Sequence, residues 1–276
     1  MIDLRKMGQH FQRIYIFMPE LKTSKSPSDS SPVYKEKESV VGKPPQAIIK
    51  APKLARQIFV NRNLRMDTVK AIGFDMDYTL ARYHQTRIES LAHKLTIKKL
   101  IDRGYPEEIT KIQFDPNFVV RGLTVDKKLG NILKLDRHGH VGSVYHGRNR
   151  VPKSDRKQNY RQEKLRIEGP RFALVDTYFE LPEICLYADL IDLAESQANN
   201  SIKADPWQLF DDIRECIDEV HRDNSLKSIL KNDLQFYIEN DEELPRTLHK
   251  FRSAGKKIFL LTNSLGEYTN AVMTHL

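Results

Sequence analysis

Residues 69–80 read VKAIGFDMDYTL and place two carboxylates directly behind a run of apolar residues. The β-branched and apolar side chains of 69–74 predict a buried strand. Asp75 and Asp77 follow at its carboxyl end, where open α/β sheets bind ligands. One carboxylate could attack a phosphorus atom while the other moves protons, and a crowded pair of carboxylates suits Mg²⁺. The alternative is a turn in which the aspartates make only local hydrogen bonds.

A second apolar strand ends in the same manner. Residues 258–264 read IFLLTNS, and a helix is expected shortly after them. The hydroxyl, amide and backbone N–H groups of Thr262, Asn263 and Ser264 could hold a phosphate at this strand-to-helix junction, although the triplet alone is also a common turn. We predict that Asp75 and Thr262 lie at the same edge of adjacent parallel strands.

The rest of the chain alternates helical and strand patterns. Asp205 and Pro206 are a helix N-cap and a proline at the first helical position. Gly130 and Gly139 are expected to turn the chain between short strands, and the basic stretch 147–171 is expected to be a loop. Helices are expected over 89–103, 182–194, 206 onward, 225–238 and 242–253, and strands within 118–146 and over 172–175. This alternation predicts an α/β fold with a partly parallel sheet.

The composition indicates a globular protein with a basic N-terminal extension. The chain has 276 residues, a hydrophobic fraction of 39% and a net charge of +8, and all of that excess lies in residues 1–70. Collagen-like and fully disordered classes are therefore excluded. Residues 22–54 are rich in Ser, Pro and Lys, so we expect 1–56 to be a basic, partly disordered extension. Within it, one helical face that could dock on a partner or cap the domain carries Phe11, Ile14, Met18 and Leu21.

The cysteines and the hydropathy of the sequence indicate the cellular compartment in which the protein is expected. Cys185 and Cys216 each stand alone, which excludes a disulfide framework and a zinc site of paired cysteines. Apolar runs fall short of the roughly 20 residues of a membrane span, and the start of the chain is a poor signal peptide. We predict a cytoplasmic protein with no membrane partner.

A charged stripe is expected on the helix that begins at Pro206. Arg214, Asp218 and His221 follow one another at i, i+4 and i+7, which places them on one side of the helix, and Lys227 comes after the next turn. On spacing alone, a solvated stripe of salt bridges is favoured over a binding site.

With these motifs, the sequence resembles the haloacid dehalogenase superfamily, whose first motif is Asp-x-Asp-x-Thr and whose second is an apolar strand ending in Thr or Ser. It is most similar to the purine 5'-nucleotidase branch, the cytosolic nucleotidases that prefer IMP and GMP. The similarity runs from about Val60 to Leu276. The matching stretches are 59–62, 73–81, 121–123, 130–131, Phe179, 181–183 and 262–264.

The resemblance implies a Rossmann-like haloacid dehalogenase core, incomplete at the C-terminus, with a large α+β cap inserted between the first and second motifs. The core would comprise 57–84 and 241–276, and the cap, which sets substrate specificity, would comprise 85–240. The implied activity is Mg²⁺-dependent hydrolysis of purine nucleoside 5'-monophosphates through an aspartyl-phosphate intermediate.

The resemblance also implies roles for single residues. Asp75 would be the nucleophile and Asp77 the acid and base, and the Asp75 carboxylate and the Asp77 backbone carbonyl would hold the Mg²⁺. Glu180 departs from the amide side chain of the human-type enzyme, so the ranking of purine substrates stays open. The phosphate-binding residues would be Thr262, Asn263 and Ser264, and the nucleotide-binding residues Phe179, Arg214, Asp218, His221 and Lys227.

The family also places a third-motif lysine and a fourth-motif acidic pair after the second motif. Since the sequence ends at Leu276, we expect it to be a fragment of a longer enzyme. The alternative is a non-catalytic, truncated phosphatase-like protein that acts as a nucleotide- or RNA-binding module. The basic stretch 147–171 could contact phosphates, but it holds one aromatic residue, Tyr160, and no RNA-binding motif, which disfavours nucleic acid. Assembly into a homo-oligomer is left open.

Overall fold

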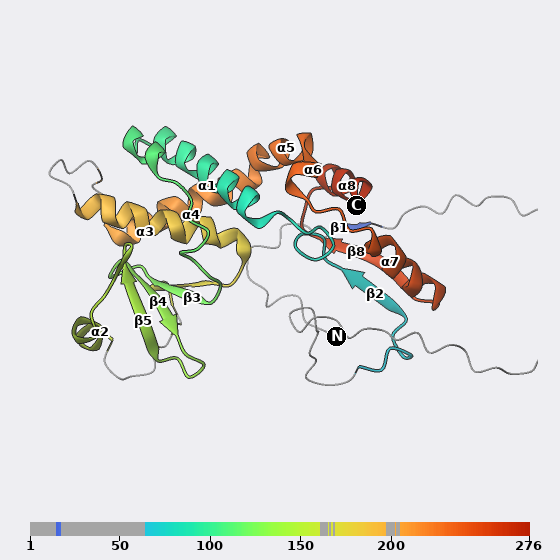
Figure 1. Ribbon diagram of the computed structural model, residues 1–276, viewed down its shortest axis with the longest axis horizontal. Coiled ribbons are helices and arrows are strands. Elements are labelled where there is room, and N and C mark those ends of the chain that lie inside the picture. Colours follow the sequence, from blue (N-terminus) through green and yellow to red (C-terminus); the bar gives the residue numbers. More distant parts are fainter. Residues whose placement is uncertain are drawn as a thin grey trace, which may run out of the picture.

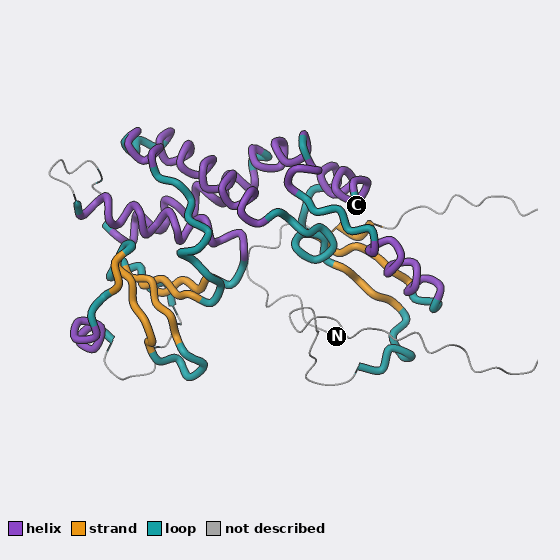
Figure 2. The backbone as a smooth tube through the Cα atoms, viewed as in Figure 1, coloured by secondary structure: helices purple, strands orange, loops and turns teal. Residues whose placement is uncertain are grey.

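The computed structural model describes residues 64–160, 165, 167, 169–196, 202 and 205–276, together with the backbone of the strand Tyr15–Phe17. Within these residues the chain forms two separate sheets with helices packed around them (Figure 1). Figure 2 shows the two groups of strands apart from each other, with the longest helices running beside and between them. The protein is therefore of the mixed α/β class, as predicted.

The smaller sheet brings the two motif strands together. It contains β1 (Tyr15–Phe17), β8 (Lys257–Thr262) and β2 (Ala71–Phe74), in the order β1-β8-β2. Strands β2 and β8 are parallel, with Phe74 opposite Leu260. The prediction of adjacent parallel strands ending at one edge of the sheet is confirmed.

Strand β1 corrects one expectation about the extension. It pairs antiparallel with β8, with Tyr15 opposite Thr262, so a helical face through this segment is wrong for Tyr15–Phe17. The rest of the predicted extension, including Phe11, Ile14, Met18 and Leu21, and the matching stretch 59–62 lie outside the described residues.

Short helices cover the smaller sheet. These are α5 (Ser225–Asn232), α6 (Leu234–Tyr237), α7 (Glu243–Ser253) and α8 (Gly266–His275). Met76 and Ala81 of the loop after β2 are completely buried in a core that includes Val220 and Val272. The predicted single helix over 225–238 is wrong at Asp233, because its side chain accepts a hydrogen bond from the backbone of Phe236 and starts α6 as a new helix.

The larger sheet is antiparallel and has the order β6-β5-β4-β3-β7. Its strands are β3 (Leu123–Asp126), β4 (Asn131–Leu135), β5 (Val141–His146), β6 (Asn149–Arg150) and β7 (Phe172–Val175). Gly130 and Gly139 turn the chain between these strands at φ values of 67° and 81°, as predicted. The predicted loop over 147–171 is wrong in part, because it contains β6 and the helix α2 (Lys153–Asn159).

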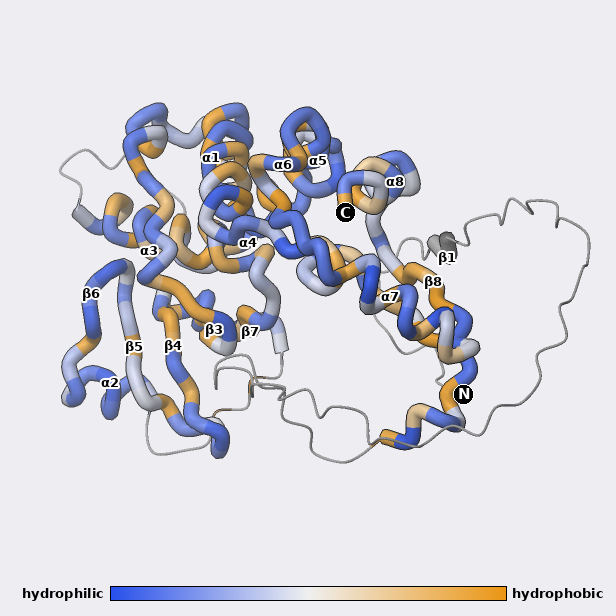
Figure 3. Tube along the Cα trace, turned by 45° about the vertical axis from the view of Figure 1, so that its right-hand side comes forward, coloured by the Kyte–Doolittle hydropathy of each residue, from blue (hydrophilic) through white to orange (hydrophobic). Residues whose placement is uncertain are grey.

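Three long helices pack beside the larger sheet. These are α1 (Gln85–Asp102), α3 (Leu181–Glu195) and α4 (Pro206–Arg222), and short 3-10 turns cover Glu107–Lys111 and Tyr178–Glu180. Asp205 caps α4 by accepting a hydrogen bond from the Gln208 backbone, as its sequence predicts. Figure 3 shows hydrophobic residues along β3, β4 and β8, whereas α7 presents mostly hydrophilic ones. None of the helices in the described residues has the length and apolar character needed to cross a membrane.

Candidate functional site

A tight turn after β2 sets the positions of the two aspartates. The backbone N–H groups of Thr79, Leu80 and Ala81 all donate to the carbonyl of Met76. Tyr78 has a φ of 57°, a left-handed conformation that costs energy in any residue with a side chain. This strained turn reverses the chain directly after the first motif and holds both aspartates at the sheet edge.

Asp75 is the freer of the two carboxylates. Its side chain is exposed, and its Oδ1 accepts a hydrogen bond of 2.8 Å from the backbone N–H of Met76. Partial removal from water raises the pKa of Asp75, and the negative charge of Asp77 raises it further. An accessible carboxylate beside a second one is suited to attack an electrophile once a cation offsets their repulsion.

Asp77, in contrast, is held by two hydroxyl groups. Tyr83 donates to its Oδ1 at 2.6 Å and Ser264 donates to its Oδ2 at 2.8 Å. The hydroxyl of Tyr83 also lies 2.8 Å from that of Tyr268. Both oxygens of Asp77 are thus fixed in direction, which suits a group that must deliver a proton along one line.

The end of β8 meets the first motif through Ser264. Thr262 and Ser264 are each 3% exposed, whereas Asn263 lies exposed between them. The Thr262 hydroxyl accepts a hydrogen bond of 3.1 Å from the Ser264 backbone N–H. Because the Ser264 hydroxyl is bound to Asp77, the groups left to contact a phosphate at this strand end are the Asn263 amide and the Thr262 hydroxyl proton.

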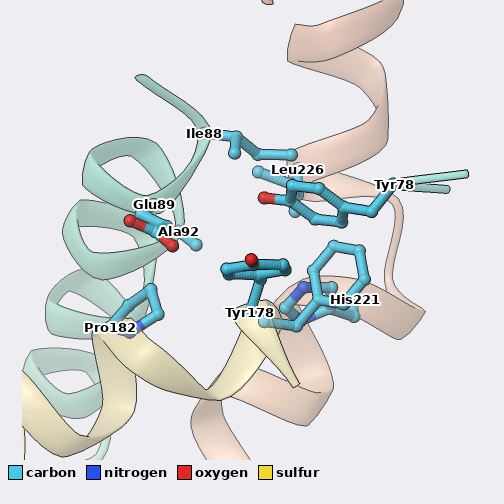
Figure 4. A pocket seen from close by; sticks show the side chains of 9 residues that line it. Tyr78, Ile88, Glu89, Ala92, Tyr178, Pro182, His221 and Leu226 are labelled. Carbon is cyan, nitrogen blue, oxygen red and sulfur yellow. The ribbon is translucent and has the colours of Figure 1, made fainter. Parts of the chain in front are cut away.

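An aromatic cluster adjoins the aspartate turn. The ring of Tyr78 lies 5.1 Å from the rings of Tyr178 and Phe179, and Phe179 meets His221 edge to face at 5.6 Å. Figure 4 shows Tyr78, Tyr178 and His221 grouped around a pocket whose far side is closed by Glu89 and Pro182. The cavity between these side chains is only about 10 Å³, space for about one water molecule. A nucleobase could stack on these rings only after they move apart.

His221 and Lys227 connect this cluster with Asp77. The Nδ1 of His221 lies 2.7 Å from the carbonyl of Ile217, and its Nε2 is buried without a hydrogen-bond partner among the described residues. Burial lowers the pKa of His221, so the imidazole is neutral. Burial also lowers the pKa of Lys227, and the charge of Asp77 opposes that shift.

Lys227 also borders a wider cavity of about 130 Å³. Its ammonium group lies 5.6 Å from the centre of the Tyr268 ring. The cavity is lined by Asn224, Lys227, Ser228, Lys231, Leu265, Glu267 and Tyr268. It lies between α5 and the first turn of α8, next to the second motif. Lys231 in its lining is paired with Glu267, so Lys227 is the lysine that faces the cavity without an acidic partner in that lining.

Arg214 is tied to the segment that carries Phe179. Its Nε donates to Glu183 and its Nη1 to Glu180, both at 2.9 Å. Glu183 is completely buried, and this burial raises its pKa to about 8 against the opposing charge of Arg214. Glu180, the position at which the sequence departs from the family, is therefore a partner of Arg214. Asp218, which lies on α4 like Arg214, is exposed.

Sequence reasoning missed several side chains of this region. Tyr83 and Tyr268 position Asp77, and Tyr78 and Tyr178 line the aromatic pocket. Glu89 is 3% exposed, and burial raises its pKa to about 7. One sequence signal was available for it, since Glu89 falls on the apolar face of a helix between the buried positions of Ile88 and Ala92.

Two comparisons with known proteins point to one family. The model of the 5' nucleotidase family matches residues 58–276. A 5'-nucleotidase domain-containing protein from Dictyostelium discoideum is 32% identical over 226 residues, which are 80% of this chain. The matched part amounts to 38% of the length of that relative.

Proposed function

The chain belongs to the 5'-nucleotidase family, and on this premise we propose that it serves the Mg²⁺-dependent hydrolysis of purine nucleoside 5'-monophosphates of the IMP and GMP type. The observation that carries the proposal is the 2.8 Å hydrogen bond from Ser264 to Asp77. It joins the carboxylate pair to the strand end that would hold the phosphate. Family membership supports a hydrolase in general, and the substrate and mechanism are the proposed part.

The two aspartates divide the reaction between them. An oxygen of Asp75 attacks the phosphorus, and the bond from phosphorus to the 5'-oxygen breaks. Protonated Asp77 gives its proton to that oxygen, so the nucleoside leaves as an alcohol. Water then attacks the phosphorus of the aspartyl phosphate and passes a proton to Asp77 while the bond from phosphorus to the Asp75 oxygen breaks. This releases inorganic phosphate and restores the Asp75 carboxylate and the protonated Asp77. The hydrogen bonds from Tyr83 and Ser264 keep Asp77 directed at the leaving oxygen.

The residues present suit a magnesium ion. Asp75 offers an accessible carboxylate, and the nearby charge of Asp77 contributes to the rise of its pKa. A hard cation bound by oxygen ligands would relieve this repulsion. We assign the Asp75 carboxylate and the Asp77 backbone carbonyl as its protein ligands, and the ion would supply positive charge to the transferring phosphoryl group.

The nucleotide would lie across the aromatic cluster and the lysines. Phe179 and His221 stand edge to face, so a purine has to separate their rings to stack on Phe179. Lys227, whose pKa responds to the charge of Asp77, would contact the phosphate together with Thr262 and Asn263, while Ser264 supports Asp77. Arg214 and Asp218 would contact the base and the ribose, and Glu180 would modify base preference through Arg214.

The test is phosphate release from IMP, GMP, AMP and UMP by the full chain with Mg²⁺. We expect purine substrates to be preferred and Asp75→Asn to abolish turnover, because an amide is a poor nucleophile. Asp67→Asn, which alters an exposed carboxylate paired with Arg65, is the matched control. Binding of IMP by the wild-type chain without phosphate release would instead support the non-catalytic binding module and contradict the proposed hydrolysis.

A further inference from the structure

A second group of polar side chains lies where α1 packs on α3, apart from the aspartate pair. It consists of His93, Cys185 and Asp189. Each offers one metal-ligating atom, and these atoms all lie within 4.8 Å of one another. Cys185 and Asp189 are one helical turn apart on α3, so they share a face, and His93 approaches them from α1.

His93 is the residue that points to a ligand. Its side chain is 2% exposed, and its Nε2 has no hydrogen-bond partner among the described residues. Burial lowers the pKa of His93 to about 4, and the positive charge of Arg148 adds to this effect. The imidazole is therefore neutral at physiological pH, the form in which histidine binds metals. A buried ring nitrogen left unpaired is rare in folded proteins.

Arg148 supplies the positive charge of this cluster. Its Nε and Nη2 each donate to Asp189 at 2.6 Å, and Nη2 also lies 3.1 Å from the Cys185 sulfur. Its Nη1 donates to Asp115 at 3.3 Å, and its Cζ lies 4.2 Å from the centre of the Phe118 ring. The guanidinium thus hydrogen-bonds to Asp189 and Cys185, two of the three metal-ligating side chains. The Nε2 of His93, the third, has no partner among the described residues.

We propose that His93, Cys185 and Asp189 form a site for Zn²⁺, with Arg148 as the cation that leaves Asp189 and Cys185 when the metal enters. The donor set of one nitrogen, one thiolate sulfur and one carboxylate oxygen suits zinc and does not suit Mg²⁺. Zinc bond lengths of about 2.0 to 2.3 Å require ligand atoms roughly 3.3 to 3.8 Å apart. The cluster therefore has to contract by about 1 Å, within the reach of side-chain rotation.

When Zn²⁺ replaces the guanidinium of Arg148, each bond formed, each bond broken and the released proton can be accounted for. Three bonds form, from zinc to the His93 nitrogen, the Cys185 sulfur and one Asp189 oxygen, and water fills the fourth position. The Cys185 thiol gives its proton to solvent, and the hydrogen bonds from Arg148 to Asp189 break. Arg148 keeps Asp115 as its partner, because Nη1 already donates to that carboxylate. The site shares no residue with the proposed Mg²⁺ site.

The experiment titrates the EDTA-treated full chain with Co²⁺ and Zn²⁺ in the presence of excess Mg²⁺. We expect one equivalent of Co²⁺ to give a tetrahedral visible spectrum and a thiolate-to-cobalt charge-transfer band, and Zn²⁺ to displace it. Cys185→Ser should remove the charge-transfer band. His93→Gln should weaken binding at least about tenfold, since even an outer-shell partner contributes that much. Arg148→Met should strengthen binding, because it removes the competing cation and keeps an aliphatic group on Phe118.

Cys216→Ser is the matched control, because Cys216 is a buried free thiol outside the cluster. It should bind like the wild type, and circular dichroism of each apo variant reports whether its fold is intact. The proposal is overturned if a folded wild-type chain binds no stoichiometric Co²⁺, or if Mg²⁺ displaces it. Three further outcomes would overturn the proposal. Co²⁺ binding could be unchanged in Cys185→Ser, it could be lost in folded Cys216→Ser, or it could weaken in folded Arg148→Met.

Discussion

The hydroxyl of Ser264 donates a hydrogen bond of 2.8 Å to Oδ2 of Asp77, across a sequence separation of 187 residues. Ser264 lies just after β8 and Asp77 just after β2, so this bond ties the ends of the two parallel strands together. The second motif therefore positions Asp77, the proposed acid and base, in addition to its proposed contact with phosphate.

Ser264→Ala should therefore lower turnover more than it lowers substrate binding. A hydrogen bond to a charged group contributes about 1.5 to 3 kcal/mol, so we expect kcat to fall about 10- to 100-fold. Steady-state phosphate release measures the effect. Thr274→Ala, which removes an exposed hydroxyl bonded only to the Asn270 carbonyl, should leave kcat unchanged, and an equal loss in both variants would contradict the role of Ser264.

Asp77→Asn should separate binding from turnover. The amide keeps an acceptor for Tyr83 or Ser264 but cannot exchange a proton with the leaving oxygen, and proton transfer of this kind contributes about 10² to 10⁴-fold. Calorimetric titration with IMP should give an affinity close to the wild type, while phosphate release falls by that factor. Retained turnover would refute Asp77 as the acid and base.

Arg214→Ala should destabilise the fold in a pH-dependent manner. It removes the partner of fully buried Glu183, whose pKa is about 8. At pH 6 Glu183 is protonated in either form, so the variant loses only the ion pair with Glu180 and the packing of Arg214. Loss of the cation raises the pKa of Glu183 further, so at pH 9 the folded variant keeps a proton that the wild type has released, which costs up to about 1.4 kcal/mol more for each pH unit above 8.

Urea denaturation at the two pH values measures this difference. Arg246→Ala, which breaks an exposed ion pair with Glu243, is the control and should change stability by less than about 1 kcal/mol at both. Equal destabilisation by Arg214→Ala at pH 6 and pH 9 would show that Glu183 does not carry the effect.

Glu89→Gln should flatten the dependence of stability on pH. Burial raises the pKa of Glu89 from 4.5 to about 7, so the folded state holds this proton more tightly than the unfolded state. This proton therefore adds to the free energy of unfolding. The added stability is fully present below pH 4.5 and is lost as the pH rises through about 7, because the unfolded chain releases the proton first.

As the pH rises across that interval, the titration of Glu89 should lower the free energy of unfolding of the wild type by about 2 to 3 kcal/mol. The Glu89→Gln variant should lack this part of the slope in chemical denaturation series between pH 4.5 and 8. Glu108→Gln changes an exposed carboxyl on the Glu107–Lys111 turn and should keep the wild-type slope. An unchanged slope in Glu89→Gln would contradict the raised pKa.

Local patterns were sufficient for most of the elements near the site. The apolar runs before Asp75 and Thr262 predicted β2 and β8 and their parallel pairing, although the predicted burial is only partial, since alternate residues of β2 are exposed. Asp205 and Pro206 predicted the start of α4 within one residue. The error at Asp233 arose because its side chain starts a new short helix. The error in 147–171 arose because β6 and α2 have only 2 and 7 residues, which periodicity over longer windows does not detect.

The sequence by itself determined the two strand ends, the amphipathic helix that carries Arg214 and His221, and the family to which the chain belongs. Only the tertiary structure decided which groups meet: Ser264 and Tyr83 on Asp77, Glu180 and Glu183 on Arg214, and His93 beside Cys185. The physical reason is the range of the forces involved. Strand and helix patterns depend on neighbours within about one or two turns, whereas a contact between distant residues depends on how whole elements pack, and burial then sets the pKa of groups such as Glu89 and His93.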